Sequence, residues 1–269
     1  MISSGSGSRT TENPPPEPPH FQEVLDGTDW ASLATPSGTG ESLPAALTRL
    51  LEPNPSIRAA AARDALDAVS HQNTIYEATV PVALYVAAIL NHPITAAGEH
   101  SHEADLQLRH PTRETLLEWL GCTAYDADDE RVAMGECHFG EGFLDACPDM
   151  GAFRDLRPVI YSAVQPFLTD DNAKVRDAAL VAAIPLAEHH ALTEHRNELA
   201  DHARRLLSTS TDRYKRDRAL DALNAWGHDT STLENANDIA AREYHARMAD
   251  HDLWWASNGT GGSAEDPPF

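Results

Sequence analysis

The sequence predicts an all-α fold of stacked antiparallel helix pairs, and three observations lead to this prediction. Apolar residues recur with a period of 3.6 at Leu43, Leu47, Leu50 and Leu51, and again between Val159 and Leu168. No convincing stretch alternates apolar and polar residues with a period of two, so strands are not expected. One helix-entry pattern also occurs three times along the chain, which indicates helices that repeat and pack on their neighbours.

The two ends of the chain differ in composition from the part between them. Residues 1–20 are rich in Ser and Gly and then in Pro, and residues 257–269 are also poor in apolar side chains. Such segments cannot bury enough apolar surface to offset the entropy of ordering. We therefore expect disordered tails around a single helical domain at 21–256, in which 94–150 contains long loops or an insertion around a helix at 112–120.

The helix-entry pattern is found in the segments 50–69, 167–189 and 206–227. Each segment begins with two large apolar residues, passes through turn residues, and then starts a helix with Arg58, Arg176 or Arg216 near its first turn. Ser, Thr, Asp and Asn in these turns cap the incoming helix, because their oxygens accept its unpaired N–H groups. We expect the arginines to pair with carboxylates of the adjoining repeat, such as Asp64 or Asp177, and so to hold the turn.

The stretch HQNTIYEAT, which begins at residue 71, combines side chains that occur in active sites and in tight corners. Its polar members are His71, Gln72, Thr74, Tyr76 and Glu77. They include a base, a carboxylate and hydroxyl groups, which acid–base catalysis would need. The repeat register favours a corner, since the helix from about Asn54 ends at His71 and Pro81 suits the first turn of the next helix. Asn73 is then expected in a left-handed conformation.

These motifs also carry a resemblance to a known family. A turn followed by Ile57-Arg58 or Val175-Arg176 and an alanine-rich helix resembles the HEAT repeat, including its phycobilisome-lyase-like branch. Asp29-Trp30 and the stretch at 71–90, followed by His92-Pro93, resemble an actinobacterial group with a His-Gln-Gly-Thr-x-Tyr-Glu-Ala-Thr type signature, in which Asn73 replaces the Gly. The resemblance implies a HEAT-like α-solenoid that generally has no catalysis of its own.

The 14 histidines raise the question of a metal site. His195 and His202 are seven residues apart on one helical face, whereas a ligand pair on a helix is usually spaced by three or four. Leu192, Leu199 and Leu206 share that face, so the two histidines are expected at the boundary of the core. The loop 99-EHSHEAD-105 has two imidazoles and three carboxylates, which makes adventitious zinc or nickel binding, and with it a metal-binding regulator, an open alternative.

No other motif indicates catalysis or a cofactor. Cys137 and His138 are adjacent in sequence, but neighbouring side chains on a helix or strand point apart, so we expect no cysteine nucleophile there. The nearby glycines do not match a phosphate-binding loop. The sequence therefore predicts no catalytic, cofactor or dedicated metal site.

The charge restricts the classes of partner. A formal net charge of −22 disfavours nucleic acid and anionic membranes as partners, and it steers basic proteins toward the chain. Three cysteines are too few and too irregularly spaced for a disulfide framework, and no apolar stretch has the length of a signal sequence or membrane span. A bacterial cytoplasmic protein is the expectation.

Two functions follow from these patterns as hypotheses. The first is a scaffold that binds a basic protein, for example as an immunity protein that neutralises a toxin, because acidic inhibitors often cover basic nuclease sites. Trp254 and Trp255 close the last helical stretch, where they are expected to cap the repeats or to bind the partner. The alternative is a lyase-like enzyme or enzyme subunit of the phycobilisome-lyase HEAT branch. The partner's identity, its binding face and the oligomeric state are not predicted.

Overall fold

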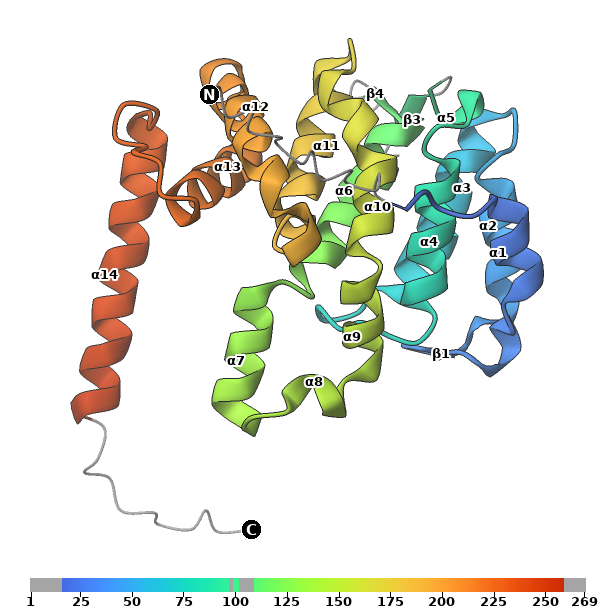
Figure 1. Cartoon of the computed structure of the whole chain (residues 1–269), viewed down its shortest axis with the longest axis horizontal. Coiled ribbons are helices and arrows are strands. Elements are labelled where there is room, and N and C mark those ends of the chain that lie inside the picture. Colours follow the sequence, from blue (N-terminus) through green and yellow to red (C-terminus); the bar gives the residue numbers. More distant parts are fainter. Residues whose placement is uncertain (1–15, 97–98, 102–108, 259–269) are drawn as a thin grey trace, which may run out of the picture. The chain divides into compact units, whose positions relative to one another are not determined.

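A computed structural model describes residues 16–96, 99–101 and 109–258 (Figure 1). The side chains of 99–101, 109–111, 245 and 249–258 lie outside the description. Most described residues are helical, which confirms the all-α prediction. The chain divides into two compact units, Met1–Leu199 and Ala200–Phe269, and each is described by itself below.

Unit 1 contains most of the helices. Its elements in chain order are α1 (Phe21–Gly27), η1 (Trp30–Ser32), β1 (Ala34–Thr35), β2 (Gly38–Thr39), η2 (Gly40–Ser42), α2 (Leu43–Arg49), α3 (Pro55–Leu66), η3 (Asp67–Val69), α4 (Thr79–Ile89), α5 (Pro93–Ala96), β3 (Glu99–Ser101), β4 (Arg109–Pro111), α6 (Thr112–Tyr125), α7 (Asp129–Phe139), α8 (Phe143–Ala146), α9 (Pro148–Asp155), α10 (Arg157–Val164), η4 (Gln165–Thr169), α11 (Ala173–Leu186) and η5 (His190–His195). α12 (Arg196–Thr209) crosses the boundary between the units.

The helices of unit 1 form two rows of neighbours. α3 packs on α6 and α6 on α11, while α1 packs on α4 and α4 on α10. The rows meet where α10 contacts α11 and α4 contacts α6. Leu116, Leu117 and Leu120 of α6 are fully buried, and burial of each such side chain stabilises the fold by about 1.5–3 kcal/mol.

The closest approach in this core is between α6 and α11. A Cβ placed on Gly121 would lie 3.1 Å from the Cα of Ala182. Gly121 and the alanines of α11 therefore allow the two backbones to come together, as expected for close helix packing at small residues. Ala182 of the alanine-rich α11 has this structural role.

Two short hairpins differ from the expectation that strands are absent. β1 pairs with β2, and β3 pairs with β4, both antiparallel. Each strand has only two or three residues, and such a length is too short to produce a visible alternation in the sequence. The hairpins are local turns between helices.

The expected tails and the 94–150 segment are only partly covered. Residues 1–15, 97–98, 102–108 and 259–269 lie outside the described residues. The covered part of 94–150 contains β3 and β4, the core helix α6, and then α7 and α8. The predicted helix at 112–120 is confirmed, and it extends to Tyr125.

Unit 2 contains the rest of α12, α13 (Arg213–Ala225) and α14 (Ala236–Asn258). α13 packs against α14. Ala219, Leu220 and Leu223 are buried on α13. None of the described helices is both long enough and apolar enough to cross a lipid bilayer.

Candidate functional site

The three repeat arginines close the loops that precede their helices. In each repeat an Asn or Asp lies four residues before the arginine and caps the helix: Asn54 accepts from the backbone N–H of Ser56, Asn172 from Lys174 and Asp212 from Lys215. The arginine then donates to the carbonyl six residues before it, which belongs to Glu52, Asp170 or Ser210. The recurring sequence pattern is thus a recurring geometry.

Arg58 shows the role most clearly. Its side chain is fully buried, and its guanidinium donates to the carbonyl oxygens of Glu52 and Pro53 and to Thr112 Oγ1 at 3.3 Å. Asp64, one of the carboxylates predicted as partners of the repeat arginines, forms an ion pair with Arg49 at the surface. Backbone carbonyls at a helix end need donors, and the planar fork of an arginine supplies several at once.

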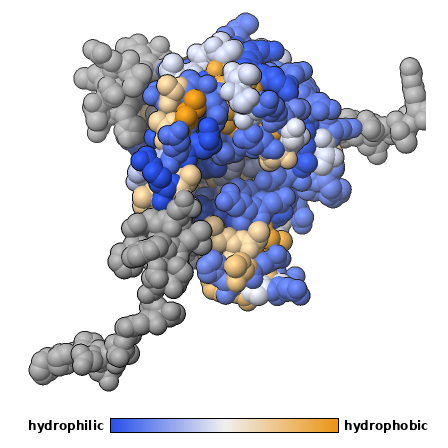
Figure 2. All heavy atoms as spheres, turned by 90° about the vertical axis from the view of Figure 1, so that its left-hand side faces the viewer, coloured by the Kyte–Doolittle hydropathy of each residue, from blue (hydrophilic) through white to orange (hydrophobic). Residues whose placement is uncertain are grey.

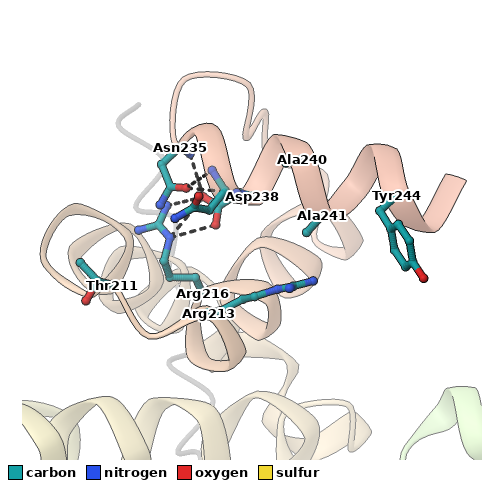
Figure 3. Close-up of a pocket in the computed structure, with 9 residues that line it drawn as sticks. Thr211, Arg213, Arg216, Asn235, Asp238, Ala240, Ala241 and Tyr244 are labelled. Atoms are coloured by element: carbon teal, nitrogen blue, oxygen red, sulfur yellow. Dashed lines mark hydrogen bonds and ion pairs between the residues drawn. The ribbon is translucent and has the colours of Figure 1, made fainter. Parts of the chain in front are cut away.

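Arg216 adds a carboxylate to the same arrangement in unit 2. Its guanidinium forms an ion pair with Asp238 of α14, and both side chains are almost completely buried (Figure 3). Further donors reach the carbonyl oxygens of Leu207 and Leu233. Hydrogen bonding from Arg216 holds the pKa of Asp238 below its ordinary value. This pair clamps α13 to α14.

A pocket of about 400 Å³ opens beside this clamp. Figure 3 shows Arg216, Asn235 and Asp238 bonded to one another at one end, with Arg213 and Tyr244 toward the other. The polar groups at the bonded end already satisfy each other. The pocket therefore fits a structural clamp better than a ligand site.

The stretch at 71–79 forms a corner, as predicted. Gln72 and Asn73 have φ values of 50° and 56°, and His71 and Thr74 pair across the turn. The left-handed conformation predicted for Asn73 is confirmed. Residues 71–74 are exposed to solvent.

Bonds from Thr79 and Glu77 attach this corner to its surroundings. Thr79 Oγ1 accepts from the backbone N–H of Tyr76 and donates to the carbonyl of Val69, both at 3.0 Å. Glu77 Oε2 accepts from the backbone N–H of Ala34 at 2.8 Å. These carboxylate and hydroxyl groups are engaged with backbone, which favours a structural role for them.

The structure also places the other candidate residues. His202 is buried on α12, and the His195 ring lies 4.8 Å from the Tyr161 ring. Cys137 is exposed, and His138 Nδ1 lies 2.8 Å from the carbonyl of Met134, with which it forms a hydrogen bond. Among the described side chains, no three His, Cys, Asp or Glu residues gather to hold a metal.

Two sets of candidates lie partly or wholly outside the description. The loop 102–105 is outside the described residues, and so are the side chains of 99–101. Trp254 and Trp255 belong to α14, but their side chains are also outside the description. Their roles stay predictions.

Helices α7 and α8 form an exposed pair, called here the α7–α8 arm (residues 129–146). Within it Gly135 is the one buried residue. Phe139 is 81% exposed and Met134 is 46% exposed. The Phe139 ring stacks on the half-buried Phe143 ring, with centroids 5.9 Å apart and planes at 15°. Figure 2 shows hydrophobic side chains gathered at the lower edge of the coloured atoms, at the height of α7 and α8 in Figure 1.

An ion pair between the buried Arg157 and the half-buried Glu188 holds the base of this arm. Arg157 of α10 donates to Glu188, with a nitrogen–oxygen distance of 3.2 Å, and to the carbonyl of Ala127 just before α7. Glu188 also accepts from the backbone N–H of Asp129 at 2.9 Å. Arg154 donates to Ala127 and pairs with Asp129. The first turn of α7 is thus attached to α9, α10 and the end of α11.

Burial has the largest influence on the pKa values at the attachment of the arm. It raises the pKa of Glu188 to about 7, and the negative charge of Asp129 raises it further. The hydrogen bond from the Asp129 N–H and the positive charge of Arg157 lower it. Burial also lowers the pKa of Arg157. Neither residue was a candidate from the sequence, because they are 31 positions apart and no motif links them.

Comparison with known proteins adds no relative. No protein-family model, no curated protein and no solved structure matches the chain.

Proposed function

We propose that this chain is a non-catalytic HEAT-like helical-repeat scaffold that binds a basic protein. The recurring capped loop with its internally bonded arginine, in the repeats of Arg58, Arg176 and Arg216, supports repeat architecture. Stacked helix pairs present extended surfaces, which suit the recognition of a protein better than chemistry on a small molecule.

The observation that carries the proposal is the excess of carboxylates at the surface. The chain has 42 Asp and Glu against 20 Lys and Arg. Among the described residues, the buried charges nearly cancel: Arg58, Arg157, Lys215 and Arg216 against Glu114, Asp128 and Asp238. Among the described residues, the excess of carboxylates is therefore found on groups that reach solvent. A surface of this kind attracts a basic partner and speeds its association.

A toxin-neutralising role is the specific form of this function that we favour. A basic nuclease must expose positive charge to bind phosphate, and an acidic scaffold that covers that charge blocks the substrate. Inhibition then requires only binding.

The test is to identify the proteins that the full chain captures in its native host, purify each, and measure its affinity by calorimetry. We expect one basic partner, with a Kd that rises at least about tenfold when NaCl increases from about 0.05 M to about 0.5 M. Loss of that partner's own enzymatic activity in the complex would support the toxin-neutralising form. If no captured protein binds after purification, or if affinity is insensitive to salt, the proposed function is wrong.

A further inference from the structure

The α7–α8 arm exposes apolar side chains to solvent. They are Met134 and Phe139, of which Phe139 is 81% exposed, and the half-buried Phe143 stacks on Phe139; these three residues are called the patch. Single exposed apolar residues are common on soluble proteins, but an exposed aromatic ring stacked on a second ring is typical of an interaction surface. The patch lies wholly in unit 1.

Contacts within the arm and at the start of α7 hold the patch in position. The Phe143 ring packs next to Gly135, where an added Cβ would lie 2.4 Å from the ring. At the start of α7, Asp128 caps the helix through the N–H of Arg131, and Glu188 accepts from Asp129. A surface that is already ordered loses little entropy when a partner binds.

Exposed carboxylates lie along both helices of the arm and in the turn between them, and Asp129 among them is paired with Arg154. The exposed acidic residues of the arm are Asp129, Glu130, Glu136, Glu141 and Asp145. Arg131 and His138 are its basic residues. The faces of Phe139 and Phe143 carry negative potential, so they attract guanidinium or ammonium groups as well as aliphatic side chains. The complementary surface combines positive charge with apolar residues.

The geometry of the arm favours a helix as the complementary element. The described arm has no strand, so it offers no edge to which a strand could be added. Its apolar side chains come from two successive helices, and a partner helix meets such a surface with anchors at i, i+3, i+4 and i+7. An amphipathic helix with Arg or Lys beside that face would meet both the rings and the carboxylates.

We propose that the α7–α8 arm is the docking surface for a basic amphipathic helix of the partner. The proposal rests on the proposed function, because it names where the basic partner binds and what it presents. Aliphatic anchors cover Phe139 and Met134, while Arg or Lys side chains approach Glu136 and Glu141. The carboxylates attract the basic groups of the partner, and apolar contact with the rings stabilises the complex.

The probe is a synthetic amphipathic helix of about five turns made of Arg and Leu, with a scrambled peptide of the same composition as its control. Calorimetry with the full chain should give at least about tenfold tighter binding of the patterned peptide. The double variant Phe139→Ser/Met134→Ser should lose this preference, since it removes the patch and leaves the charge unchanged. Circular dichroism melts check that the variant is folded, which we expect because both side chains are exposed.

A charge-matched pair of variants separates docking from general attraction. Glu136→Gln/Glu141→Gln removes two charges beside the patch and should weaken binding of the patterned peptide at least about fivefold at low salt. Glu23→Gln/Asp26→Asn removes two exposed charges from α1, on the other side of unit 1 in Figure 1, and should change its Kd by less than about twofold.

Three outcomes would overturn the inference. One is equal binding of the patterned and scrambled peptides, and another is unchanged binding by Phe139→Ser/Met134→Ser. A third is sedimentation that shows a dimer of the free chain which the double variant abolishes, because the patch would then be covered by a second copy. If the purified native partner still binds in any of these cases, the proposed function stands without this docking surface; if it does not bind, the proposed function itself is wrong.

Discussion

At the residue scale, Arg58 is the clearest case of a buried charge with a structural task. It closes the loop between α2 and α3 by donating to two backbone carbonyls, and Arg216 does the same before α13. A buried guanidinium is costly to desolvate, and hydrogen bonds to several acceptors offset that cost. Removing the side chain leaves the carbonyls without donors.

Arg58→Ala should therefore destabilise the protein by about 2–4 kcal/mol. The matched control is Arg49→Ala, because Arg49 is half-exposed and has a single surface ion pair with Asp64. That change should cost no more than about 1 kcal/mol. Urea denaturation followed by circular dichroism measures both. Equal losses for the two variants would show that the loop does not depend on Arg58.

The turn at Gln72 and Asn73 stores backbone strain, because both residues have positive φ without being glycine. A two-residue turn with this geometry favours Asn-Gly. The double change Gln72→Asn/Asn73→Gly should raise the stability by up to about 1 kcal/mol, measured as a higher Tm by calorimetry. Gln72→Val, which places a β-branched residue at positive φ, should lower the Tm. A Tm that rises with valine would contradict the turn geometry.

Glu188 should make stability depend on pH. Its pKa is raised from 4.5 to about 7 in the folded protein. Between these values the unfolded chain releases the proton and the folded chain keeps it, so the contribution of Glu188 is fully present below about pH 4.5 and is lost as the pH rises through 7. The loss by pH 8 amounts to about 2–3 kcal/mol.

Glu188→Gln removes this titration and keeps an acceptor for the Asp129 N–H. The difference in free energy of unfolding between wild type and variant should therefore fall by about 2–3 kcal/mol from pH 5 to pH 8. Urea denaturation of both proteins at the two pH values measures it. A difference that stays constant would mean that Glu188 titrates in the folded protein as it does in the unfolded chain.

At the scale of elements, the sequence predicts features formed by residues that are close along the chain, but not features that depend on how the helices pack. The capped helix entries before Arg58 and Arg176 were predictable, because the Asx cap and the arginine are only four residues apart. The corner at Asn73 was predictable for the same reason. The base of the arm was not, since Arg157 and Glu188 meet only after α10 and α11 have packed.

The exposed patch was also beyond prediction from the sequence. Phe139 directly follows the Cys137-His138 pair in the sequence, and nothing in its local sequence pattern indicates whether its ring is buried. Phe143 of α8 packs on Gly135 of α7, whereas Phe139 lies at the surface and is 81% exposed. Side-chain burial on a short helix depends on its tertiary partners.

Gly135→Ala tests whether Phe143 packs on α7, because this packing and helix propensity predict opposite effects of the substitution on stability. Alanine in a helix is favoured over glycine by about 0.5–1 kcal/mol, but the new Cβ would meet the Phe143 ring at 2.4 Å. Gly151→Ala in α9 is the matched control, because nothing lies within 4 Å of its Cβ position. We expect Gly151→Ala to stabilise the protein by about 0.5–1 kcal/mol.

Gly135→Ala should instead give no gain in stability. Amide exchange across 129–146, measured by hydrogen exchange and mass spectrometry, should become faster. If Gly135→Ala stabilises the protein as much as Gly151→Ala does, Phe143 does not pack on α7.

At the scale of the whole molecule, the chain combines a strong excess of carboxylates with the apolar patch on the α7–α8 arm. A net charge of −22 is expected to favour basic proteins in general, over distances of about a Debye length, roughly 8–10 Å at physiological salt. Charge alone gives little selectivity, and specificity needs an apolar contact that the wrong partner cannot make. Phe139 and Met134 on the arm would supply that contact.

Hydrogen exchange of the full chain, with and without the patterned Arg/Leu peptide, tests this central claim most directly. Slowed exchange should concentrate in residues 129–146; Phe139→Ser/Met134→Ser should abolish this effect, and Glu23→Gln/Asp26→Asn should leave it intact. Protection spread over many acidic surfaces, or protection on other helices with 129–146 unchanged, would contradict it.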